Sequence, residues 1–154
     1  MKNSQDWSPS ELGRELLRTA SSGPNGSAGT YGRSVAGAAL RFFALGRGRR
    51  RLLLTAAHHA NEWITAPLLL RFAGELAAGV WPGALDGTRV FFAPLVNPDG
   101  ARLVTGELAS GPLFENARRI AEKYPDIPFP DGWKANLRGV DLNLQYPAGW
   151  EEAK

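Results

Sequence analysis

Two adjacent histidines, His58 and His59, are the only histidines in the chain, and Glu62 follows three residues after the second. Residues three apart on a helical turn lie on one face, so the His59 imidazole and the Glu62 carboxylate can approach each other. A nitrogen and an oxygen placed in this way can bind one zinc ion at about 2.0–2.2 Å. An H-x-x-E pair also occurs by chance, and the alternative is that these side chains only cap a helix.

Composition excludes several other kinds of chemistry. The chain has no cysteine, which rules out disulfide scaffolds, thiolate zinc sites, iron–sulfur clusters and cysteine nucleophiles. The formal net charge is only +3. An arginine-rich stretch at residues 46–50 could bind phosphate, but no aromatic residues alternate with its arginines. We therefore interpret it as the exposed turn of a hairpin and expect no nucleic-acid partner.

The apolar pattern predicts strands alternating with helices. Helices are expected at residues 9–20, 65–78 and 112–124, strands at 31–35, 39–45, 51–57, 88–95 and 139–144, and a loop at 21–29. This order predicts an α/β fold with a mixed, mostly parallel sheet flanked by helices. His58 directly follows an expected strand, at the carboxyl end where ligands gather in such folds.

Three stretches, the first of which contains the histidines, form a recognisable pattern: Leu54–Thr65 (LTAAHHANEWIT), Val96–Gly100 (VNPDG), and Trp133–Asn136 (WKAN) with Gly139–Asn143 (GVDLN). In this order they resemble the zinc carboxypeptidase A-like metallopeptidase family, over about residues 30–150. The resemblance implies the N-terminal part of a carboxypeptidase-like α/β/α domain. We expect residues 1–29 to form an N-terminal helix and loop, and residues 30–154 to form part of the catalytic domain.

The resemblance also implies roles for individual residues. It makes His59 and Glu62 two of three protein ligands of Zn²⁺, with Asp141 accepting the other ring N–H of the histidine. The alternative for Asp141 is a carboxylate in a turn at a strand end. The N-P-D-G stretch is expected to be structural, with Pro98 and Gly100 setting a tight bend.

Three polar residues correspond to the substrate-contacting part of the family pattern. Lys134 stands where the family has an arginine that polarises the scissile carbonyl and stabilises the oxyanion, although lysine lacks the bidentate fork. Asn143 corresponds to a substrate-binding asparagine, and Arg138 is a nearby second candidate for binding substrate. Their alternatives are ordinary turn chemistry for Asn143 and a solvated loop charge for Arg138.

The chain departs from the family pattern in two ways. Leu144 replaces the arginine that usually clamps a free C-terminal carboxylate, and the stretch DLNLQYPAGWE (residues 141–151) resembles the bacterial γ-D-glutamyl-meso-diaminopimelate peptidase branch. That branch cleaves cell-wall peptides, so a peptide or muropeptide substrate is expected. In addition, no histidine follows His59. The family's third zinc ligand and its general-base glutamate are therefore expected to be absent.

These departures lead to two hypotheses. In the first, the chain is part of a zinc peptidase, inactive alone and dependent on a complementary C-terminal fragment. In the second, it is a non-catalytic module that binds peptides or cell-wall fragments. Residues 1–7 carry no apolar stretch of a signal peptide, and no apolar run approaches the roughly 20 residues of a membrane span. We therefore expect a cytoplasmic protein with no membrane contact.

Overall fold

The computed structural model describes residues 8–149 and 151–152. The expectation for residues 1–7, and Trp150 of the DLNLQYPAGWE stretch, lie outside the described residues. The elements in chain order are α1 (Pro9–Ser22), β1 (Ser27–Arg33), β2 (Ala39–Gly46), β3 (Arg50–Thr55), the 3₁₀ helix η2 (Ala60–Glu62), α2 (Thr65–Ala77), β4 (Thr88–Ala93), α3 (Pro98–Val104), α4 (Pro112–Ala121) and the 3₁₀ helix η3 (Leu142–Gln145).

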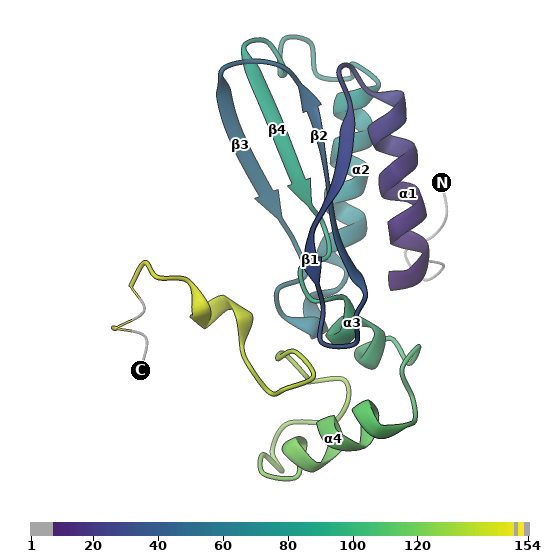
Figure 1. Ribbon diagram of the computed structural model, residues 1–154, viewed down its shortest axis with the longest axis vertical. Coiled ribbons are helices and arrows are strands. Elements are labelled where there is room, and N and C mark those ends of the chain that lie inside the picture. The colour runs from purple at the N-terminus through teal and green to yellow at the C-terminus, as the bar shows by residue number, and fades with distance from the viewer. Residues whose placement is uncertain (1–7, 150, 153–154) are drawn as a thin grey trace.

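The four strands form one mixed sheet in the order β1-β2-β4-β3 (Figure 1). β3 and β4 are parallel, whereas β1 pairs antiparallel with β2 and β2 pairs antiparallel with β4. The expected mixed sheet flanked by helices is confirmed. Within the described strands, however, antiparallel pairs outnumber the parallel one, which differs from the expected predominance of parallel pairing.

Residues 46–50 are not the turn of a hairpin, so that prediction is wrong. β4 lies between β2 and β3, and the chain from Gly46 to Arg50 connects two strands that do not pair with each other. Gly46 makes this connection possible because its φ of 76° lies in the left-handed region. The arginines nearby, such as Arg50 and Arg51, are exposed.

Two other expectations differ from the structure. Residues 21–29 were expected to form a loop, but α1 extends to Ser22 and β1 begins at Ser27. The Ser27–Thr30 stretch has a weak strand propensity, but its backbone pairs with residues 41–44 of β2. These hydrogen bonds outweigh the local preference. The expected division of the chain into residues 1–29 and 30–154 stays a prediction, and its boundary falls inside β1. Residues 139–144 form no strand; a turn and η3 occupy this stretch.

The main core lies between one face of the sheet and the helices α1 and α2, which lie side by side (Figure 1). Its members are Leu12, Leu16, Ala20, Phe43, Leu45, Ala57, Ala66, Leu70, Ala73, Leu76, Val90 and Phe92. The Phe43 and Phe92 rings stack with centroids 4.7 Å apart, which joins β2 to β4 beneath the helices. α2 begins at Thr65 as expected, and Pro67 lies in its first turn, where its missing N–H removes no helical hydrogen bond.

A second apolar cluster lies beyond the carboxyl ends of β3 and β4. It contains the buried residues Ala60, Leu103, Ala117, Trp133 and Leu137, and so joins η2, α3, α4 and the loop that follows α4. This cluster brings the segment after residue 133 back to the end of β3. None of the helices in the described part of the chain is long and apolar enough to cross a membrane.

Candidate metal centre

The loop that carries His59 and Glu62 has a conformation held by one threonine. After β3, Ala57 takes a φ of 51°, a left-handed conformation that is uncommon for residues other than glycine. Its backbone N–H donates to the Thr65 hydroxyl (2.9 Å), and this hydroxyl donates to the Glu62 carbonyl (2.8 Å). Thr65 therefore joins both sides of the loop, and η2 turns Glu62 back towards His59.

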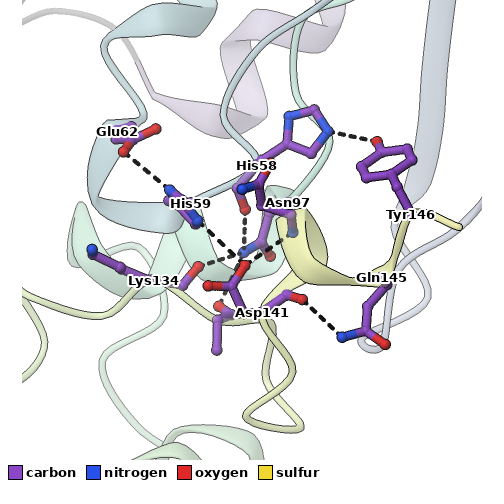
Figure 2. A network of polar contacts seen from close by, with 10 residues as sticks. His58, His59, Glu62, Asn97, Lys134, Asp141, Gln145 and Tyr146 are labelled. Carbon is purple, nitrogen blue, oxygen red and sulfur yellow. Dashed lines mark hydrogen bonds and ion pairs between the residues drawn. The ribbon is translucent and has the colours of Figure 1, made fainter. Parts of the chain in front are cut away.

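The two ring nitrogens of His59 face two different carboxylates (Figure 2). Nδ1 lies 3.0 Å from Glu62 Oε1, and Nε2 lies 3.3 Å from Asp141 Oδ1. The His59 side chain is 18% exposed, Asp141 is 32% exposed and Glu62 is 53% exposed, so the site opens to solvent on the Glu62 side. Asp141 comes from a segment about eighty positions further along the chain, and only the fold brings it to the histidine.

Asn97 holds the parts of the site together. It is 2% exposed, and its amide nitrogen donates to the carbonyls of His58 (3.2 Å), Lys134 (3.4 Å) and Ala135 (3.0 Å). Its amide oxygen accepts from the Gly100 N–H (3.1 Å) and so caps α3. One buried side chain thus connects the loop that carries His58, His59 and Glu62 (the ligand loop) with the Trp133–Asn136 loop and α3.

The N-P-D-G stretch is the start of a helix and not the expected tight bend. Pro98 occupies the first position of α3, and a Cβ on Gly100 would lie 2.7 Å from that of Ala60, so the glycine permits close packing of α3 on η2. Asp99 is buried and accepts from the Ser34 hydroxyl and the Ala36 N–H. The expectation that this stretch is structural agrees with these contacts.

The three predicted substrate-contacting residues, Lys134, Arg138 and Asn143, are all exposed, and each has a backbone hydrogen bond to a different group. The Lys134 carbonyl accepts from the Ala60 N–H at 3.0 Å, which anchors its backbone beside η2, and its side chain is exposed. Asn143 is exposed in η3, and its N–H donates to Asp141 Oδ1 at 2.9 Å. Arg138 is exposed in a tight turn in which the Asn136 side chain accepts from its N–H.

His58 has a definite partner that the sequence did not reveal. Its Nε2 lies 2.7 Å from the Tyr146 hydroxyl, and the two rings are 5.7 Å apart. Burial, with a smaller contribution from neighbouring His59, lowers the pKa of His58, and Glu62 and Asp141 partly oppose this shift. Burial, and secondarily Tyr146, raises the pKa of Tyr31 in β1.

Two contributors to the site are missing from the sequence analysis, namely Asn97 and the pair of His58 with Tyr146, and only the first has a signal in the sequence. The Asn97–Pro98 pair is the usual signature of a capped helix start, so the capping role of Asn97 was available from the sequence. No local signal connects His58 with Tyr146, which lies 88 residues further along the chain.

The donors at His59 and Glu62 fit zinc chemically. An imidazole nitrogen and a carboxylate oxygen are both common zinc donors, and their separation of 3.0 Å lets them bind one ion together. The carboxylate of Asp141 on the other ring nitrogen is the usual partner of a metal-binding histidine. Among the residues that the structure describes, no three His, Cys, Asp or Glu side chains gather into a metal site. Within the described residues, the side chains that fit a zinc ion are therefore two, His59 and Glu62.

Sequence comparison places this chain in a known class of protein. The chain matches the zinc carboxypeptidase family over residues 15–154, and it belongs to that family. It is 36% identical over 130 residues to γ-D-glutamyl-L-diamino acid endopeptidase 1 of Lysinibacillus sphaericus, covering 78% of this chain and 32% of that protein. It is 33% identical over an alignment of 161 positions to the protein YqgT of Bacillus subtilis, covering 96% of this chain and 42% of that protein.

The fold is also shared with solved carboxypeptidase structures. A metallo-carboxypeptidase from Burkholderia cenocepacia superposes with a TM-score of 0.58 at 20% identity, over 90% of this chain and 32% of that one. The chain thus spans 32% and 42% of the length of the two curated relatives named above.

Proposed function

We propose that this chain contributes to zinc-dependent hydrolysis of peptide or isopeptide bonds in cell-wall-derived peptides such as those with a γ-D-glutamyl-diaminopimelate linkage. The observation that carries the proposal is the position of His59 between Glu62 and Asp141. The substrate class is supported by the Lysinibacillus sphaericus relative, whose name describes cleavage at a γ-D-glutamyl-L-diamino acid bond. A cytoplasmic location stays a prediction.

Each residue of the site has a chemical task under this proposal. A bound zinc ion supplies Lewis acidity for the carbonyl and lowers the pKa of a bound water. Asp141 would accept the Nε2–H of His59 and so hold the ring in the tautomer whose Nδ1 lone pair is available to an ion shared with Glu62. The exposed ammonium of Lys134 provides positive charge for a developing oxyanion. Leu144 offers no guanidinium for a free C-terminal carboxylate, which favours a substrate recognised by other groups.

The remaining machinery is proposed to come from a complementary polypeptide segment. His58 is the only other histidine of the chain, and its Nε2 lies against Tyr146. A catalytic zinc site commonly uses three protein ligands. We therefore expect the chain by itself to bind zinc weakly and to have negligible peptidase activity.

Metal binding is the first test. Isothermal titration with Zn²⁺ is expected to show one site, with affinity reduced at least about tenfold by His59→Ala or Glu62→Ala, because each removes one of two protein ligands. Glu122→Ala is the matched control, since this carboxylate is exposed and pairs with the exposed Arg118 of α4. Equal zinc affinity in all four proteins would contradict the proposed site.

Activity is the second test. A γ-D-glutamyl-diaminopimelate peptide is incubated with zinc and this chain, with and without the part of the Lysinibacillus sphaericus relative that follows the segment matched by this chain. Turnover is expected only in the mixture and is expected to be lost with His59→Ala. Robust turnover by the chain alone would refute dependence on a complementary segment. Peptide binding without any zinc binding would favour the non-catalytic module.

A further inference from the structure

The segment that carries Asp141 has almost no hydrophobic anchor. The second apolar cluster holds the chain up to Leu137, but η3 contains no buried residue, and residues 143–146 are exposed. The hydrogen bonds that η3 makes within itself, such as Asn143 N–H to Asp141 Oδ1 and Gln145 Nε2 to the Asp141 carbonyl, give it a shape but do not attach it to the rest of the molecule. Before Asp141, the Asn136 N–H donates to the Val140 carbonyl (2.9 Å) and holds the start of the segment. Beyond that point, the contacts that join η3 to the loop of His58 and His59 come from the side chains at its ends.

Two such contacts connect the segment to the ligand loop, one at each end of η3 (Figure 2). At the start, Asp141 Oδ1 lies 3.3 Å from His59 Nε2. At the end, the Tyr146 hydroxyl lies 2.7 Å from His58 Nε2. The adjacent histidines therefore hold the two ends of the same short helix. The Asp141 contact alone is long and partly exposed, and partly exposed pairs of this kind contribute little by themselves.

We propose that His58 and Tyr146 are positioning residues for the metal centre: their hydrogen bond fixes η3 so that Asp141 stays on His59 Nε2. The inference deepens the proposed function and rests on it in one respect, namely that His59 is a zinc ligand. Orientation of a ligand by its hydrogen-bond partner is what makes such outer groups matter for metal affinity. A shift of Asp141 would free the His59 ring to rotate, so that Nδ1 would less often lie beside the Glu62 carboxylate and zinc affinity would fall.

The test compares two identical substitutions at different tyrosines. Tyr146→Phe removes the hydroxyl that meets His58 and leaves the ring, whereas Tyr124→Phe makes the same change at an exposed tyrosine of the loop after α4. Tyr146→Phe is expected to weaken Zn²⁺ binding about 3–10-fold, the usual net effect of one hydrogen bond, and Tyr124→Phe to leave it unchanged. Because Tyr146 is half-exposed, the change removes nothing from the core.

A double-mutant cycle separates positioning from a general structural effect. Asp141→Asn is expected to weaken zinc binding about 10–100-fold. If Tyr146 acts through Asp141, adding Tyr146→Phe to Asp141→Asn has no further effect. Additive losses, or a Tyr146→Phe protein that binds zinc as the wild type does, would overturn the inference.

A metal-free measurement distinguishes failure of this inference from failure of the proposed function. Hydrogen exchange of the Asn143 and Leu144 amides, which bond to Asp141, is expected to accelerate about 3–10-fold in Tyr146→Phe and not in Tyr124→Phe. If the wild type binds no zinc, the proposed function fails, and this exchange still decides the role of Tyr146. Unchanged exchange would refute the attachment of η3 by His58.

Discussion

His58 and His59 are neighbours in the chain, but their imidazoles meet different partners and have different proposed tasks. His59 lies between two carboxylates, which suits a metal ligand with a fixed tautomer. His58 is half-buried against Tyr146, and its lowered pKa favours the neutral ring. Adjacent residues diverge in this way because the extended backbone at His59 sends successive side chains in opposite directions.

The lowered pKa of His58 predicts a pH effect on stability. Its ordinary pKa is 6.5, so as the pH falls through this value the unfolded chain takes up a proton before the folded chain does. This group's contribution to stability is therefore present above pH 6.5 and is lost as the pH falls through the lower pKa of the folded state. Urea unfolding of the metal-free chain at pH 7.5 and 5.5 is expected to show a larger loss for the wild type than for His58→Gln. An NMR titration midpoint above 6.5 for His58 would contradict the prediction.

At the scale of the elements, the site depends on how the ends of β3 and β4 are joined to later loops. β4 leads through Val96 to Asn97, whose backbone N–H donates to the Ala57 carbonyl beyond β3, while its side chain binds three other carbonyls. The parallel pair β3–β4 thus delivers the ligand loop and the cap of α3 to one edge of the sheet. The Trp133–Asn136 loop is attached there by the same asparagine.

Asn97→Asp separates the two roles of this side chain. The carboxylate still accepts from Gly100 N–H, but it cannot donate to the carbonyls of His58, Lys134 and Ala135, and it buries a charge among them. We expect the free energy of unfolding to fall by at least about 2 kcal/mol, measured by urea denaturation. Asn25→Asp, an exposed change in a turn, is expected to stay within about 0.5 kcal/mol of the wild type. Similar stabilities for the two variants would show that donation by Asn97 is unimportant.

At the scale of the whole molecule, β3 is an outer strand of the sheet, and one face of the sheet carries no helix in the part of the chain that the structure describes (Figure 1). β3 pairs with β4 on one side only, and Leu52 and Leu53 are 48% and 64% exposed. On the face away from α1 and α2, Phe42 and Phe91 contact each other with centroids 6.3 Å apart. Unpaired strand edges with exposed apolar residues favour pairing with other chains.

We therefore expect concentration-dependent self-association through β3. Leu53→Lys is expected to weaken it about tenfold or more, because the lysine would place a charge where an apolar side chain would be buried. Leu68→Lys is the control, since Leu68 is equally exposed (67%) but lies on α2. Sedimentation velocity over a range of concentrations measures the effect. Equal weakening by both variants would locate the contact elsewhere.

Much of this protein was determined by local patterns in its sequence. The spacing of apolar residues predicted α1, α2, β2 and β4 to within a few residues, because burial of one face imposes a period that is visible in the sequence. Proline near the start of α2 set its beginning for the same local reason. The pair His59 and Glu62 was also local, since residues three apart meet on one turn of backbone.

Only the tertiary structure decided the strand order and the contact of His58 with Tyr146, whereas the pairing of Asp141 with His59 was already implied by the family resemblance and the structure supplied its geometry. The order β1-β2-β4-β3 depends on pairing between distant segments. The sequence of residues 46–50 is compatible both with a hairpin turn and with a connection between two strands that do not pair, so it could not decide between them. Gly139–Leu144 resembled a strand, but no strand among the described residues lies beside it to complete a ladder, and η3 forms instead. The contacts of Asp141 with His59 and of Tyr146 with His58 span more than eighty residues. Such contacts depend on chain folding as a whole, because no local periodicity encodes which distant segments meet.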